Sequence, residues 1–243
     1  MKVDILAIGV HPDDVELSCS GTLLRHIAAG KRVGLLDLTR GELGTRGNAG
    51  IREKEAAEAA EKMGALFRKN TGMADGFFTY GRENILKIVH ILRWCRPEVV
   101  LANAPDDRHP DHGRAAKLTA DACFYAGLIK IETTDEHGRH QKHWRPKALY
   151  HYIQDRHLQP DFVVDITDFF EKKMALIQTF RSQFFLPEGE AFGNELQTPI
   201  SGEDFLKFMR AKARAFARPI SAGFAEGFIA ARTLGVNDLF DIK

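Results

Sequence analysis

Residues 3–39 read VDILAIGVHPDDVELSCSGTLLRHIAAGKRVGLLDLT, and this stretch decides the fold class. Residues 3–10 are an apolar run that stops at a turn, as a buried strand of a parallel sheet does. Residues 17–29 have the character of a helix, and Gly30 follows them as a helix-ending residue. Residues 31–39 predict a second strand. A strand, a helix and a strand of these lengths form the opening unit of a doubly wound sheet.

The rest of the chain continues the alternation of helices and strands. Further helices are expected at residues 51–63, 82–95, 112–127, 168–184 and 201–218, and further strands at 98–103, 148–153 and 162–166. Ser201 and Asp204 predict a capping box at the start of the last helix, whereas the glycines of residues 40–50 and 187–199 predict loops. Because no repeat or linker divides the sequence, we expect a single α/β domain over residues 1–243. Its sheet would be Rossmann-like, doubly wound and mostly parallel, with helices on both faces.

Composition narrows the class of partner and the compartment. A formal net charge of +1 gives no electrostatic reason to expect a nucleic acid or an anionic membrane as partner. Cys19, Cys95 and Cys123 are far apart, which argues against a disulfide framework and against a thiolate zinc site. No apolar run approaches the length that crosses a bilayer, and the run at residues 5–10 is too short for a secretory signal. We therefore expect a cytoplasmic protein.

The first candidate site is His11-Pro12-Asp13-Asp14, directly after the first predicted strand. Ligands commonly bind at the carboxyl ends of parallel strands. His11 and Asp14 offer a nitrogen and an oxygen, which are both good zinc donors, while Asp13 stays free as a base that takes a proton from water. The alternative is structural, because either aspartate would serve as a cap of the following helix and Pro12 as a turn residue.

The second candidate site, residues 108–112, repeats the His-Pro-Asp pattern after another predicted strand. Two such turns can face each other at the switch point of a doubly wound sheet. His112 would complete a set of three protein ligands with one open position, the pattern of catalytic zinc. His109 is then placed to donate to a developing oxyanion or a leaving amine, with Asp111 holding its imidazole in one tautomer. The alternative is a solvated turn with both histidines on an exposed helix start.

Together the two motifs resemble those of the PIG-L-like (LmbE-like) zinc deacetylases, which act on N-acetylglucosaminyl groups. The family pattern HPDD is matched by residues 11–14, and HxxH by residues 109–112. The resemblance covers essentially the whole chain, and it looks closest to the bacillithiol-biosynthesis branch, which deacetylates N-acetylglucosaminyl malate. The supporting stretches are residues 11–16, 39–47, 108–112, 182–184, 225–228 and 234–240.

Carried over by position, the resemblance implies a catalytic zinc centre. It implies one Zn²⁺ per chain, bound by His11, Asp14 and His112. Asp13 would be the general base, and His109 would stabilise the tetrahedral intermediate or protonate the departing amine. The implied substrate is a small N-acetylated amino-sugar conjugate, most specifically N-acetylglucosaminyl malate.

The resemblance also extends to two arginines, and it leaves the role of one glutamate open. Arg52 and Arg108 match positions where the branch has arginines that line the substrate pocket. An arginine fork suits the two carboxylates of malate, although Arg52 would otherwise be a helix-surface residue. Much of the family has HPDDE as its first motif, whereas here Val15 precedes Glu16. That spacing matches the bacillithiol branch and leaves the role of Glu16 open.

Two other functions compete with this interpretation. One is a metal-dependent hydrolase of another bond, such as a phosphoester, whose sites are often dinuclear and need more ligands. The other is a non-catalytic Rossmann-like binding module in which the histidines are structural. A site with two histidines and one aspartate also accepts iron or cobalt, so the sequence does not fix the metal. Because members of the family often assemble, a homo-oligomer is a further expectation.

Three remaining features have simpler explanations. His137, His140 and His143 lie among charged residues and predict a solvated loop rather than a second metal site. Cys19 predicts a small buried thiol. The basic helix at residues 207–218 is expected to pack through its apolar side chains, which are Phe205, Phe208, Met209 and Phe216, and to expose its charges.

Overall fold

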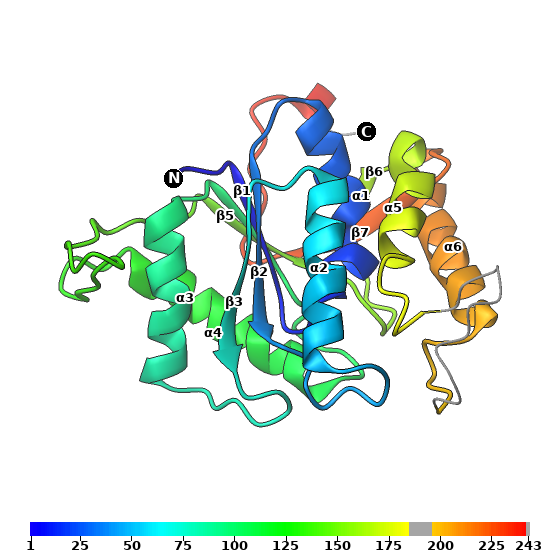
Figure 1. Cartoon of the computed structure of the whole chain (residues 1–243). Helices are drawn as coiled ribbons and strands as arrows, with labels where there is room; N and C mark the ends of the chain where they lie inside the picture. Colours follow the sequence, from blue (N-terminus) through cyan, green and yellow to red (C-terminus); the bar gives the residue numbers. More distant parts are fainter. Residues whose placement is uncertain (185–195, 242–243) are drawn as a thin grey trace.

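The computed structural model describes residues 1–184 and 196–241, in which seven strands form one sheet (Figure 1). The strands are β1 (Ile5–Gly9), β2 (Val33–Thr39), β3 (Arg68–Met73), β4 (Val99–Ala102), β5 (Ala148–Tyr152), β6 (Phe162–Asp165) and β7 (Ala225–Ala230). Their order across the sheet is β3-β2-β1-β4-β5-β7-β6. The pairs from β3 to β5 are parallel, and β7 runs antiparallel to both β5 and β6. The sheet is therefore mixed but mostly parallel.

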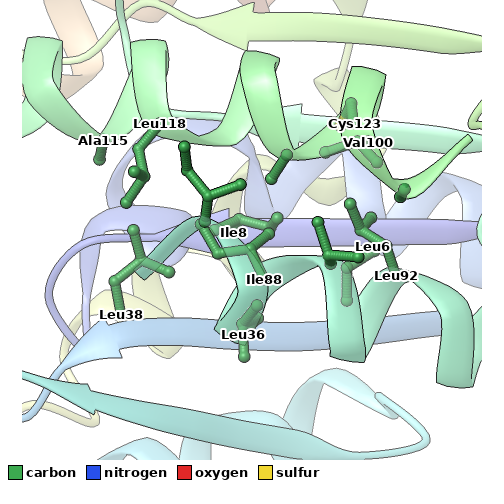
Figure 2. Close-up of a cluster of buried hydrophobic side chains, with 14 of the residues drawn as sticks. Leu6, Ile8, Leu36, Leu38, Ile88, Leu92, Val100, Ala115, Leu118 and Cys123 are labelled. Carbon is green, nitrogen blue, oxygen red and sulfur yellow. The ribbon is translucent and has the colours of Figure 1, made fainter. Parts of the chain in front are cut away.

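Helices cover both faces of the sheet (Figure 1). The helices are α1 (Asp14–Ala28), α2 (Ala49–Met63), α3 (Arg82–Cys95), α4 (Pro110–Ala126), α5 (Phe170–Ile177) and α6 (Glu203–Ala217). α3 and α4 pack on one face, where Leu6, Ile8 and Leu36 meet Ile88 and Leu118 (Figure 2). On the other face lie α1, α2 and α5, and α6 packs beyond them against β7. The predicted α/β class with helices on both faces is confirmed.

The strand order places a switch point between β1 and β4. From β1 the chain continues to β2 and β3 on one side, and from β4 it continues to β5 on the other. Connections leaving in opposite directions open a crevice at the carboxyl ends of the two central strands. Residues 11–14 follow β1 and residues 108–112 follow β4, so the predicted meeting of the two motifs is confirmed.

Several predicted elements differ from the structure. Strand β3 was not expected, because its sequence RKNTGM is polar, as suits the edge of a sheet. Strand β7 was not expected either, because it carries Glu226 and Gly227. The helix predicted at 168–184 is shorter in the structure: a 3₁₀ turn at Thr167–Phe169 leads into α5, which ends at Ile177. Part of the loop predicted at residues 187–199 lies outside the described residues.

The prediction of a capping box at Ser201 is wrong. Helix α6 begins at Glu203 with Gly202 as its cap, and no side chain caps it. The Ser201 hydroxyl instead accepts a hydrogen bond from the Thr198 N–H at 2.8 Å, because the chain turns before the helix starts. Within the described residues, no helix combines the length and the apolar character that a bilayer-spanning segment needs.

A buried ion pair ties α1, α5 and β7 together. Lys173 Nζ lies 2.5 Å from Glu226 Oε1, and both side chains are almost completely buried. Lys173 also donates to the Leu17 carbonyl at 2.8 Å, while Glu226 accepts from the N–H groups of Gly21 and Thr22 at 3.1 and 2.7 Å. The two charges therefore satisfy backbone groups inside α1, which holds the helix behind the first motif.

We expect Lys173→Met to destabilise the protein by about 3–5 kcal/mol, because it leaves the carboxylate of Glu226 buried without its partner. The neighbouring Lys172 is exposed, so Lys172→Met is the matched control and should change stability by less than about 1 kcal/mol. Urea unfolding followed by circular dichroism measures both. Equal stability of the two variants would contradict a structural role for the pair.

Candidate active site

The Asp14 carboxylate lies between two imidazoles at the switch point. His11 Nδ1 is 3.8 Å from Asp14 Oδ2, and His112 Nε2 is 3.4 Å from Asp14 Oδ1. All three side chains are buried, and they come from the end of β1, the first turn of α1 and the first turn of α4. The structure therefore brings together the three residues predicted as metal ligands.

Hydrogen bonds fix the orientation of the Asp14 carboxylate. Its Oδ2 accepts from the N–H groups of Val10 and His11 at 2.9 and 3.0 Å and from Asn103 Nδ2 at 2.9 Å. Its Oδ1 accepts from Gln154 Nε2 at 2.6 Å. These donors precede α1 or come from the ends of β4 and β5, so Asp14 does not cap its own helix. Asp13 occupies the cap position but makes no side-chain capping bond.

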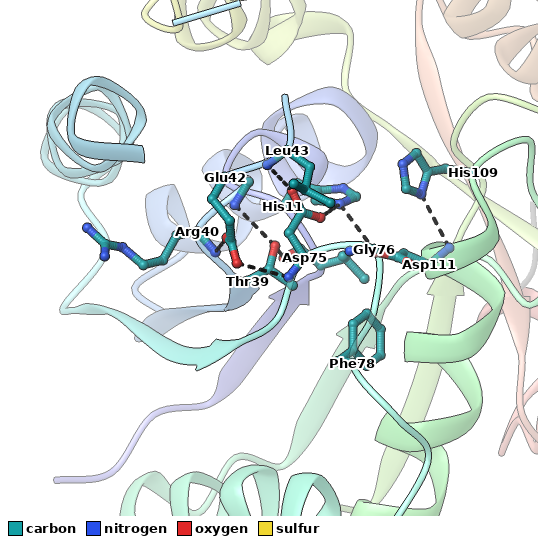
Figure 3. Close-up of polar contacts among 12 residues, drawn as sticks. His11, Thr39, Arg40, Glu42, Leu43, Asp75, Gly76, Phe78, His109 and Asp111 are labelled. Carbon is teal, nitrogen blue, oxygen red and sulfur yellow. Dashed lines mark hydrogen bonds and ion pairs between the residues drawn. The ribbon is translucent and has the colours of Figure 1, made fainter. Parts of the chain in front are cut away.

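Two further carboxylates hold the imidazoles from behind. His112 Nδ1 is 2.5 Å from Asp107 Oδ2, which leaves its Nε2 directed toward Asp14. His11 Nε2 is 3.0 Å from Asp75 Oδ1 (Figure 3). This contact leaves His11 Nδ1 on the side of Asp14. A carboxylate on the second nitrogen is the usual support of a metal-binding histidine, because it fixes the ring and raises its basicity.

The electrostatics of the pocket favour a cation. Burial alone would lower the pKa of His11, but Asp111 and Asp75 outweigh it and raise that pKa to about 9. Burial likewise opposes a proton on His112, but Asp14 and Asp107 raise its pKa to about 10. Because these carboxylates stabilise positive charge on both rings, the same donor set fits a divalent metal ion that takes the place of the protons.

The candidate metal-binding groups of the described chain all include His11. Ligand atoms of His11, His109 and His112 lie within 4.8 Å of one another, and so do those of His11, Asp75 and Asp111. We favour a position bounded by His11, His112 and Asp14. The ring nitrogens of His112 and His11 that face away from Asp14 are already bonded, to Asp107 and to Asp75. The nitrogens on the side of Asp14 therefore remain for a metal ion.

Asp13 is held beside this position in an unusual backbone conformation. Its φ of 137° lies in a region that non-glycine residues rarely adopt, so the surrounding contacts must hold it there. Arg52 Nη2 binds Asp13 Oδ2 at 2.6 Å and the Pro12 carbonyl at 3.1 Å. Burial raises the pKa of Asp13, Arg52 lowers it, and the result is about 6. A carboxyl with this pKa is able to accept a proton near neutral pH.

A glycine makes the clamp on Asp13 sterically feasible. Arg52 Nη1 donates to the Gly41 carbonyl at 3.2 Å. A Cβ at Gly41 would lie 2.1 Å from that nitrogen, and the residue has a φ of 65°. Residues 40–50 were predicted to be a loop because of their glycines, and one function of that loop is to admit the guanidinium. The loop is also tied to Asp75, which accepts from the Leu43 N–H at 2.9 Å (Figure 3).

His109 lies next to His11 and His112 but is held differently. Its ring centroid is 4.8 Å from that of His11 and 5.2 Å from that of His112. Its Nδ1 accepts a hydrogen bond from the Asp111 N–H at 3.3 Å, which leaves Nε2 to carry the proton of the neutral ring (Figure 3). Burial, together with His11 and His112, lowers the pKa of His109, so the ring is neutral at pH 7 and can donate from Nε2.

The predicted contact between the Asp111 carboxylate and the His109 ring requires correction. The carboxylate accepts from the Gly76 N–H at 2.8 Å and from Arg114 Nη1 at 2.9 Å, and it lies 3.8 Å from His11 Nε2. It is the backbone of Asp111 that bonds to His109, because His109 caps α4 and the Asp111 side chain points the other way. The tautomer of His109 is therefore set by a main-chain donor.

The two predicted substrate arginines both line the pocket, and both are in ion pairs. Arg52 is buried and bound to Asp13. Arg108 Nε lies 2.6 Å from Asp155 Oδ2, but 54% of its side chain is exposed, so it is accessible to a ligand. Glu16 is buried and does not line the pocket; its Oε1 lies 2.6 Å from Arg68 Nη1. The structure thus places Glu16 in a structural ion cluster.

These groups converge in a pocket of about 530 Å³. One part of its lining is polar and contains the histidines, Asp13, Asp14 and Arg108. Another part is apolar and comes from the segment that leads into α6 and from α6 itself. A pocket with convergent polar groups beside an apolar wall is typical of small-molecule sites.

The sequence did not reveal four residues that support the predicted ligands. Asp107 lies five residues before His112, in the loop that precedes α4, and Asp75 follows β3, which was itself not predicted. Asn103 and Gln154 lie at the ends of β4 and β5. Only Asp107 had a signal, since it belongs to the same acidic turn as the second motif. By contrast, His137, His140 and His143 are exposed, as predicted for a solvated loop.

Comparison with known proteins identifies the family. A family model described as PIG-L, GlcNAc-PI de-N-acetylase, matches residues 6–123. A diacetylchitobiose deacetylase from Thermococcus kodakarensis is 30% identical over 190 residues, which cover 74% of this chain and 70% of that protein. The chain belongs to the PIG-L family. It is accordingly a metal-dependent amide hydrolase of the carbohydrate N-deacetylase class, as the resemblance implied.

Two further comparisons extend along most of the chain. A 1D-myo-inositol 2-acetamido-2-deoxy-alpha-D-glucopyranoside deacetylase from Saccharopolyspora erythraea is 27% identical, over 80% of this chain and 88% of that protein. The conserved protein TT1542 from Thermus thermophilus superposes with a TM-score of 0.83 and 36% identity, covering 97% of this chain and 98% of that one. The PIG-L fold therefore extends beyond the residues that the family model matches.

We expect Gln154→Leu to weaken Zn²⁺ binding about 10- to 100-fold, because it removes a donor that orients Asp14. Competition with a fluorescent chelator measures the affinity. Gln141 is an equally buried amide that bonds to the His90 carbonyl, so Gln141→Leu controls for the general cost of the change. Unchanged affinity in Gln154→Leu would show that this amide does not position the carboxylate.

Proposed function

We propose that this PIG-L protein is a zinc-dependent N-deacetylase that hydrolyses the acetamide of an N-acetylglucosaminyl conjugate. The observation that carries the proposal is the placement of Asp14 between His11 and His112, beside Asp13 and His109. In this proposal His11, Asp14 and His112 bind one Zn²⁺ per chain. Three protein ligands leave a position open for water or substrate.

Each nearby side chain has a defined task in this reaction. Zn²⁺, when bound, lowers the pKa of water and polarises the acetamide carbonyl. Asp13 takes the proton of the attacking water, and Arg52 keeps its carboxylate aligned. His109 donates from Nε2 to the oxygen on which negative charge develops. Asp13 then returns its proton to the amine that leaves, which completes the exchange of the acetyl group for a proton.

In this proposal Asp111 and Arg52 position the neighbouring histidines and the base. Asp111 supports His109 through its backbone N–H and lies close to the second nitrogen of His11 through its carboxylate. Arg52 positions the base, and because this buried side chain also lines the pocket, the predicted contact with substrate is kept as a further role. The side chain that is best placed for a charged substituent is Arg108.

Two conjugates are candidates for the substrate. N-acetylglucosaminyl malate is the prediction from the sequence, and it is supported by the position of Arg108, which would have to exchange Asp155 for a malate carboxylate. Diacetylchitobiose is favoured by the similarity to a diacetylchitobiose deacetylase over 74% of this chain. Both contain the same acetamide on glucosamine, so the reaction at the metal is the same.

Three broader predictions accompany the proposal. Zinc suits a site of imidazole and carboxylate ligands, although such a site also binds iron or cobalt. A cytoplasmic location is consistent with three cysteines that are all buried and unpaired. A homo-oligomer remains a prediction from the resemblance, and neither a nucleic acid nor a membrane is expected as partner.

The proposal is tested by release of acetate from N-acetylglucosaminyl malate, diacetylchitobiose and free N-acetylglucosamine, before and after removal of metal. We expect release from at least one conjugate, loss of it with a chelator, and recovery with Zn²⁺. Asp13→Asn should lower kcat about 100- to 10,000-fold while the zinc content stays at one per chain, because the base is lost and the ligands remain. Near-normal turnover in Asp13→Asn would refute its assignment as the base.

The two candidate substrates respond differently to loss of Arg108. Arg108→Ala should raise KM for the malate conjugate about 10- to 150-fold, since a charge-assisted hydrogen bond contributes about 1.5–3 kcal/mol. It should leave KM for diacetylchitobiose within about twofold. Arg156 is an equally exposed arginine paired with Asp106, so Arg156→Ala is the matched control. An unchanged KM for the malate conjugate would remove the support for that substrate.

A further inference from the structure

Three phenylalanines form a ladder from the core to the pocket. Phe184 is buried, and the Phe205 ring stacks on it with centroids 5.8 Å apart and planes within 8°. Phe208 follows with its centroid 6.2 Å from that of Phe205. The sequence predicted that Phe208 packs in the core with its helix, but 42% of it is exposed. The ladder therefore ends in an aromatic ring that reaches solvent.

The exposed end of the ladder lies in the wall of the catalytic pocket. The apolar wall consists of Leu196, Pro199, Ile200, Phe205, Phe208 and Met209. Met209 anchors the wall because it is buried, whereas Leu196 is 73% exposed and, like Phe208, remains available for contact. Exposed apolar side chains that cluster beside a polar site mark a surface that a ligand covers.

The chemistry of the wall discriminates between the candidate substituents. None of its six side chains carries a charge, and the accessible arginine of the lining, Arg108, lies outside this wall in its ion pair with Asp155. An acyclic dicarboxylate has no apolar face to lay on a phenyl ring. A pyranose or cyclitol ring presents a face of C–H groups that packs on an aromatic ring, while its hydroxyls point into water.

We propose that Phe208, supported by Phe205, is the platform for the group attached to N-acetylglucosamine, and that this group is an uncharged ring such as a second pyranose. The inference rests on the proposed N-deacetylase function, which it refines. Substrate specificity then depends on two sites in one pocket. The metal side acts on the acetamide, and the apolar wall selects the substituent by stacking.

The test compares kcat/KM for acetate release from free N-acetylglucosamine, diacetylchitobiose and N-acetylglucosaminyl malate in zinc-loaded full-length protein. We expect Phe208→Ala to lower kcat/KM for diacetylchitobiose about 5- to 10-fold, while the values for free N-acetylglucosamine and the malate conjugate change less than twofold. Phe208→Trp keeps an aromatic face and should preserve the preference. Phe124 is another exposed phenylalanine, near the opposite end of α4 from His112, and Phe124→Ala should change none of the three values.

The outcomes separate this inference from the function on which it rests. If Phe208→Ala lowers kcat/KM equally for all three substrates, or for none of them, the platform is overturned while the deacetylase function stands. A larger loss on the malate conjugate than on diacetylchitobiose would also overturn it. Failure of the unaltered protein to release acetate from any of the three substrates would refute the proposed function itself, and the inference with it.

Discussion

The orientation of one buried carboxylate, that of Asp14, is the constraint on which the rest of the site depends. Two main-chain N–H groups and two side-chain amides fix it between His11 and His112. A charged carboxylate is stable in a buried position only when it is paired and hydrogen-bonded in this way. The strand order supplies the arrangement, because β1 and β4 are neighbours at the switch point and deliver one histidine each.

The remaining groups of the site follow from that arrangement. Once the chain turns after β1 to present Asp14, Asp13 must adopt a φ of 137°, and Arg52 stabilises this conformation by binding both the carboxylate and the Pro12 carbonyl. Strain at a functional residue persists when its neighbours determine its position. The glycine-rich loop admits the guanidinium and also fixes Asp75 behind His11. The same loop therefore helps to position both the base, Asp13, and the carboxylate that supports the ligand His11.

The sequence predicted the parts of this structure that depend on local pattern. The apolar strands, the amphipathic helices and the repeated His-Pro-Asp turns have periodic or motif signals, so the fold class and the grouping of His11, Asp14 and His112 could be derived. What it could not reveal depends on distant contacts. β3 has the polar composition of an edge strand, and β7 contains a buried glutamate that accepts hydrogen bonds from N–H groups of α1. The carboxylate of Asp111 turns away from His109, the histidine it was expected to hold. Asn103 and Gln154 carry no recognisable motif.

We propose that the turns after β1 and β4 together build one metal centre with three protein ligands. The most direct measurement is anomalous diffraction at the zinc absorption edge from crystals of the zinc-loaded protein. We predict a single peak per chain within bonding distance, about 2.0–2.2 Å, of nitrogen atoms of His11 and His112 and an oxygen of Asp14. A peak among His11, Asp75 and Asp111 instead, or a pair of peaks about 3.5–4 Å apart as in dinuclear hydrolases, would contradict the account.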